Sequence, residues 1–159
     1  MIKRLIPVPT KKIVAVSGGF DPIHVGHVRM ILSAAHHGDV IVILNSDDWL
    51  KDKKGYAFMP WEERAEILRA MKGVINVVTT IDDEDGTVCN TLRNLKNDMG
   101  LSLFANGGDR TATTTPEMEV CKELGIGLLW NIGGGKVQSS SSLLTKAQYG
   151  KRRFNGLEF

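Results

Sequence analysis

Short apolar runs alternate with amphipathic segments along nearly the whole chain, and this alternation constrains the fold more than any other feature. The apolar, strand-like runs span residues 13–17, 40–44, 74–81, 101–105 and 126–132. Apolar residues at helical spacing occupy 25–37, 60–73, 87–99, 117–124 and 140–147. Strands that alternate with helices predict an α/β fold in which a five-stranded parallel sheet carries helices on both faces, with right-handed crossovers.

Length and charge limit the classes of function. A chain of 159 residues predicts one domain over 1–159, with a lead-in at 1–12 and a tail at 150–159. Lys and Arg total 20 against 18 for Asp and Glu, so the net charge of +2 argues against a nucleic-acid partner. The apolar runs are too short for a membrane span. Cys89 and Cys121 form no C-x-x-C pair, and no signal peptide is evident, which favours reduced thiols in a cytoplasmic protein.

The junction between the first strand and the first helix carries the densest group of candidate functional residues. Residues 18–27 read G-G-F-D-P-I-H-V-G-H. Ligands of open α/β sheets bind where strands end and helices begin, and a helix N-terminus suits phosphate. His24 and His27 are three residues apart, so both imidazoles can face one bound group and donate hydrogen bonds to it. A metal pair is the alternative for two such histidines, but no third ligand is obvious nearby.

The full string resembles the H-x-G-H signature of the nucleotidyltransferase superfamily, which includes the cytidylyltransferases and several adenylyltransferases. The resemblance covers about residues 13–147 and implies a single Rossmann-like domain. Class I aminoacyl-tRNA synthetases share a related motif, but this chain has no K-M-S-K-S string.

Three further segments carry the resemblance in the expected order. Residues 45–64 hold an N-S-D strand end, a lysine-rich loop that includes K-K-G-Y, and E-R in a helix, similar to glycerol-phosphate, ethanolamine-phosphate and heptose-phosphate nucleotidyltransferases. Residues 106–110, N-G-G-D-R, resemble a G-G-D motif beside the nucleotide. The serines at 139–142 resemble a motif that caps the last helix and holds the triphosphate. Lys136 is a loose match to an arginine that precedes this motif.

The resemblance implies a role for each matching residue. The catalytic set is His24, His27, Lys53 and Lys54. The nucleotide-binding set is Gly18, Gly19, Phe20, Asp21, Gly26, Gly107, Gly108, Asp109, Ser140, Ser141 and Ser142; helix capping or loop bracing is the alternative for Asp21. The substrate-binding set is Asp47, Lys51, Arg64 and Arg110; a solvated position in a basic loop is an equal alternative for Lys51. We expect no metal site made by the protein, because Mg²⁺ would arrive on the triphosphate.

The predicted reaction joins a nucleoside monophosphate from CTP or ATP to a small phosphorylated polyol, sugar or amino alcohol and releases pyrophosphate. The run from H-V-G-H to E-E-R favours CTP, whereas the G-G-D motif favours the ATP-dependent heptose branch. The partners are therefore a nucleoside triphosphate and a phosphorylated acceptor, and a homodimer is also compatible with the family. A nucleotide-binding regulator without turnover is the alternative from another class.

Overall fold

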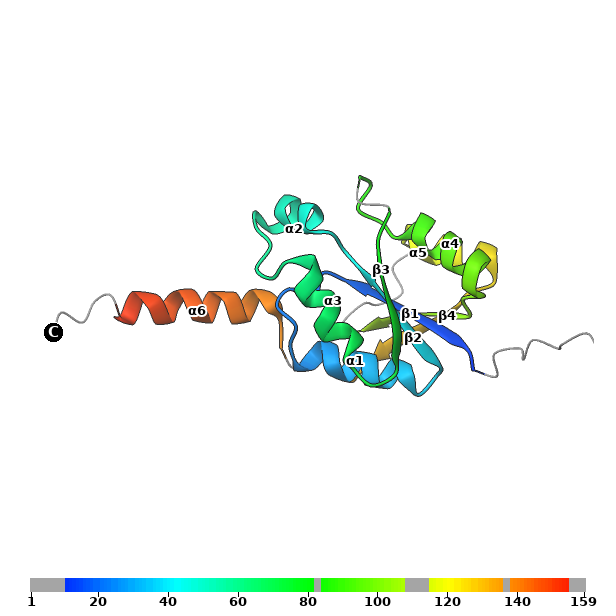
Figure 1. Ribbon diagram of the computed structural model, residues 1–159, viewed down its shortest axis with the longest axis horizontal. Helices are drawn as coiled ribbons and strands as arrows, with labels where there is room; N and C mark the ends of the chain where they lie inside the picture. Colours follow the sequence, from blue (N-terminus) through cyan, green and yellow to red (C-terminus); the bar gives the residue numbers. More distant parts are fainter. Residues whose placement is uncertain (1–10, 82–83, 108–114, 136–137, 155–159) are drawn as a thin grey trace, which may run out of the picture.

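The protein is a three-layer α/β structure, seen in a computed structural model that describes residues 11–81, 84–107, 115–135 and 138–154 (Figure 1). The strands are β1 (Ile13–Gly18), β2 (Asp39–Leu44), β3 (Val74–Thr79), β4 (Leu103–Gly107) and β5 (Gly127–Ile132). They form one parallel sheet in the order β3-β2-β1-β4-β5. The predicted fold class is therefore confirmed.

The helices are α1 (Val25–Ala35), α2 (Asp47–Lys54), α3 (Trp61–Arg69), α4 (Cys89–Met99), α5 (Pro116–Leu124) and α6 (Ser140–Phe154). In the described part of the chain, none of them combines the length and the apolar character that a membrane crossing requires. Figure 1 shows α6 extending away from the rest of the protein. It runs to Phe154, so the segment from 150 that the sequence indicated as a tail begins as helix.

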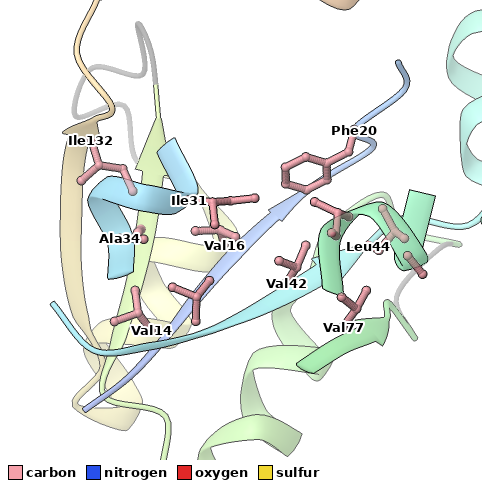
Figure 2. Close-up of a cluster of buried hydrophobic side chains, with 13 residues drawn as sticks. Val14, Val16, Phe20, Ile31, Ala34, Val42, Leu44, Val77 and Ile132 are labelled. Atoms are coloured by element: carbon pink, nitrogen blue, oxygen red, sulfur yellow. The ribbon is translucent and has the colours of Figure 1, made fainter. Parts of the chain in front are cut away.

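Alternate side chains of the central strands build two separate cores, as the two-residue period of a strand requires. Val14 and Val16 of β1 pack with Ile31 of α1 and Leu68 of α3 on one face, part of which Figure 2 shows. Ala15 and its neighbours in register pack with α4 and α5 on the other face. Burial on both faces explains why the central strands read as continuous apolar runs.

Helix α2 is the main difference from the sequence prediction, which placed a lysine-rich loop here. Ser46 caps its N-terminus by accepting from the amide of Trp49 at 3.0 Å, and Gly55 ends it with a φ of 90°. Acidic residues occupy the first turn and lysines the last, which favours the helix dipole. Leu50 is its fully buried anchor. Only one of its eight residues is buried, which left little periodicity to detect.

The arrangement of the sheet places a crevice beside β1. Helix α1, which follows β1, covers one face, whereas α5, which follows β4, covers the other. β1 and β4 are neighbours, so the chain leaves their carboxyl ends in opposite directions. Such a reversal point is where open α/β sheets bind ligands.

Candidate functional site

A cavity of about 550 Å³ occupies this crevice. Its walls come from the ends of β1, β4 and β5, the turn before α1, and the segment that leads into α6. The lining residues are Ser17, Gly18, Phe20, His24, Gly26, His27, Met30, Ala105, Asn106, Gly107, Ile132, Gly133, Gly134, Gly135, Gln138, Ser139 and Ser140. Three of the four sequence motifs therefore meet at one cavity.

The two histidines hold each other and the start of α1 in place. His24 is the N-cap residue, and its Nδ1 accepts from the amide of Gly26 at 3.1 Å. In return, Nδ1 of His27 accepts from the amide of His24 at 3.2 Å. The rings stack with their centroids 3.8 Å apart. Because both Nδ1 atoms accept hydrogen bonds, the proton of each neutral ring is on Nε2.

The surroundings of both rings favour the uncharged form. Burial, with smaller contributions from His24 and Lys54, lowers the pKa of His27 from 6.5 to about 3. Burial also lowers the pKa of His24. The ring of Phe20 lies 4.8 Å from that of His27, centroid to centroid. At neutral pH the cavity therefore contains two neutral imidazoles that donate through Nε2–H.

The three lysines of α2 have different surroundings. The ammonium of Lys54 donates to the carbonyl oxygen of Asp21 at 2.6 Å and is close enough to His27 to lower its pKa. Lys51 is exposed and forms an ion pair with Asp48 at 3.5 Å. The ammonium of Lys53 lies 4.4 Å from the centre of the Trp49 ring. We call residues 18–27, which connect β1 to α1, the histidine turn. Of the three lysines, Lys54 is the one that the structure places at this turn.

Arg64 and Asp47, predicted to bind substrate, instead pair within the protein. Arg64 is fully buried and donates to Oδ1 of Asp47 at 2.6 Å. It also donates to the carbonyl oxygens of Gly19, Asn45 and Met59. A guanidinium with these bonds and no exposure does not face a ligand. We therefore correct the assignment of Arg64 from substrate binding to support of Gly19, in the turn between β1 and α1.

Some of the predicted nucleotide-binding residues line the cavity, and others contact only the protein. Gly18, Gly26 and Gly107 line the cavity, whereas Gly19 packs on α2, where an added Cβ would lie 2.9 Å from Leu50. Asp21 is buried and outside the lining, with its carboxylate bonded to backbone, so the loop-bracing alternative is what its contacts show. Gly108, Asp109, Arg110 and Lys136 lie outside the described residues.

Of the serine motif, Ser140 lines the cavity and donates to the carbonyl oxygen of Pro22 at 2.9 Å. Ser139 lines it as well and accepts from the amide of Ser142 at 3.1 Å, which makes it the cap of α6. Ser141 and Ser142 are exposed and outside the lining.

Sequence reasoning did not single out five residues whose side chains line the cavity, namely Ser17, Met30, Ala105, Ile132 and Gln138. Met30 is three residues after His27 on α1, so helical spacing could have identified it. Gln138 had no pattern to indicate it. Within the described parts of the chain, no group of three or more His, Cys, Asp or Glu side chains is arranged to hold a metal ion.

The sheet order, the H-x-G-H turn and the cavity at the strand ends define a Rossmann-like domain of the nucleotidyltransferase type. Residues 15–125 match the family described as cytidylyltransferase-like. The chain belongs to this family.

Individual relatives agree with this assignment. The chain is 31% identical over 145 residues to the "Bifunctional protein HldE" of Streptomyces coelicolor, covering 88% of this chain and 29% of the relative. It is 45% identical over 67 residues to the "FAD synthase" of Pyrococcus abyssi, covering 41% of this chain and 45% of the relative. The chain thus spans less than half the length of these curated relatives.

A solved structure shares the fold. The lipopolysaccharide core biosynthesis protein of Thermoplasma volcanium superposes with a TM-score of 0.60 at 18% identity, over 77% of this chain and 96% of that one.

Proposed function

We propose that this protein transfers a nucleotidyl group from a nucleoside triphosphate to a small phosphorylated acceptor. An oxygen of the acceptor phosphate attacks the α-phosphorus of the triphosphate. The bond from that phosphorus to the oxygen bridging to the β-phosphorus breaks, and pyrophosphate leaves as its magnesium complex. The product is a diphosphate that joins the nucleoside to the acceptor.

The observation that carries the proposal is the pair of neutral imidazoles at the start of α1. Charge on the α-phosphate oxygens is redistributed as the new bond forms, and donors fixed in advance stabilise it most effectively. His24 and His27 have this property, because backbone amides fix their tautomers and stacking fixes their rings.

Absence of a carboxylate from the described cavity lining also fits this chemistry. A phosphate acceptor is already ionised at neutral pH, so the attack needs no general base. Catalysis then rests on alignment and on charge stabilisation. Lys54 supplies a cation at the turn that carries His27, and the N-terminus of α6, with Ser140, suits the β- and γ-phosphates.

The proposal also concerns which nucleotide base the protein selects and which acceptor it uses. The sequence pattern favours CTP, whereas a relative named FAD synthase makes ATP the main competitor, because FAD contains adenosine. Gly107, Gly133 and Met30 line one side of the cavity, with both glycines packed against Met30, and we propose that this wall accommodates the planar base.

The test is pyrophosphate release by the full chain with magnesium and each of CTP, ATP, UTP and GTP. The acceptors are a polyol phosphate, a sugar phosphate, an amino alcohol phosphate and riboflavin 5′-phosphate. We expect one pair to release pyrophosphate, and His27→Ala to slow it by roughly 10²–10³. His37→Asn, on the exposed surface just after α1, is the matched control and should be unaffected.

A thermal-shift series with the same nucleotides separates the alternatives. A nucleotide that raises the melting temperature without any pyrophosphate release from any acceptor would contradict transfer and favour a regulator.

A further inference from the structure

We propose that Asp21 is a positioning residue that holds the Lys54 ammonium at the turn that carries His24 and His27 before any nucleotide binds. This inference rests on the proposed function, since it assigns Lys54 to the reacting phosphates. It adds a residue that touches neither nucleotide nor acceptor and acts through the lysine.

The contacts of Asp21 connect the histidine turn to the connection between α2 and α3. Its two carboxylate oxygens accept from the amides of Phe58 and Met59, each at 2.7 Å. Its backbone carbonyl accepts from the Lys54 ammonium at 2.6 Å, and its Oδ2 lies 3.7 Å from the same nitrogen. Asp21 therefore fixes both the end of α2 that carries Lys54 and the segment that follows it.

Burial makes this arrangement costly unless every charge has a partner. The side chain of Asp21 is fully buried, and that of Lys54 is 23% exposed. The two amides and the ammonium together compensate the carboxylate. The ammonium also lowers the pKa of His27, so the anchored cation lies within electrostatic reach of that ring.

The contacts of Arg64 show that Asp21 is not the residue that alone attaches the turn between β1 and α1 to the connection between α2 and α3. Arg64 already donates to Gly19 of the turn and to Met59 of the loop. What Asp21 adds is the fixed position of the Lys54 ammonium. The neighbouring Lys51 illustrates the alternative, because its ion pair lies on the exposed surface of α2.

A double-mutant cycle distinguishes positioning from plain structural support. We expect Lys54→Met to lower kcat by roughly 10² and Asp21→Asn to lower it by at least about tenfold, with KM for the nucleotide changed less than about threefold. In the Lys54→Met background, Asp21→Asn should have no further effect. Asp98→Asn, an exposed carboxylate on α4, is the matched control. Effects that multiply in the double variant, or an unchanged kcat in Asp21→Asn, would overturn the proposal.

A second measurement needs no variant and no activity. Nuclear magnetic relaxation of the lysine side chains in the ligand-free wild-type protein should show Lys54 restrained and Lys51 mobile. Equal mobility of the two would overturn the inference even if the cycle could not be completed because Asp21→Asn unfolds. A wild-type protein that releases no pyrophosphate with a restrained Lys54 would instead count against the proposed function.

Discussion

Replacing His27 with Gln should remove a specific part of the acid sensitivity of the fold. The pKa of His27 falls from 6.5 in the unfolded chain to about 3 in the folded protein, chiefly through burial. Between these two pH values the unfolded chain binds a proton that the folded protein does not bind. The free energy of unfolding therefore decreases as the pH falls, by at most about 1.4 kcal/mol per pH unit.

The magnitude follows directly from this difference. From about pH 6.5, where the unfolded imidazole is half protonated, to about pH 4.5, the wild-type protein should lose roughly 2 kcal/mol through His27 alone. The Gln variant has no such proton to bind and keeps His24, the carboxylates and the rest of the chain. The stability difference between wild type and variant should thus shift by that amount as the pH falls.

Urea denaturation of both proteins at several pH values across this range measures the shift. A stability difference that stays constant across the range would refute the reasoning, because it would mean that folded His27 binds its proton as readily as the unfolded chain does. The account of His27 as a neutral Nε2–H donor would then fail as well.

Three further outcomes are expected. His24→Asn should keep the cap of α1 and the melting temperature but lose pyrophosphate release, whereas His24→Gln, whose amide reaches the position of Nε2, should retain more of that activity; equal activities would contradict the donor role. Arg64→Met should lower the free energy of unfolding by about 3–5 kcal/mol in urea denaturation, because it leaves the Asp47 carboxylate and several carbonyl groups without their donor. Gly133→Ala should lower it by about 1–2 kcal/mol or more, since φ is +86° and the new Cβ would lie 2.8 Å from the backbone of Met30. Gly135→Ala, with nothing within 4 Å of the added Cβ, is the control for stability.

The sheet could be predicted from sequence because burial on both faces leaves a strong trace in each central strand. Helix α2 could not, because its stability comes from caps, end charges and the single buried anchor Leu50. None of these produces the periodic pattern on which the prediction relied.

For the site, the sequence predicted contacts between residues that are close along the chain but not contacts between distant residues. His24 and His27 are close in sequence, so their spacing alone placed them together. Arg64 contacts Gly19 across 45 positions and Asp21 contacts Phe58 across 37. A motif shows that such residues belong near the site but does not show whether they face the ligand or the protein. The contacts show that the side chains of Arg64 and Asp21 face the protein.

The most direct test of nucleotidyl transfer follows the oxygen atoms of the acceptor. The protein is incubated with magnesium, the triphosphate selected by the screen and an acceptor whose phosphate oxygens are all ¹⁸O. Mass spectrometry and ³¹P nuclear magnetic resonance then locate the label. We expect every labelled oxygen in the nucleoside diphosphate product, one of them bridging the two phosphorus atoms, with unlabelled pyrophosphate as the other product. Labelled pyrophosphate, or orthophosphate released without a joined product, would contradict attack of the acceptor on the α-phosphorus.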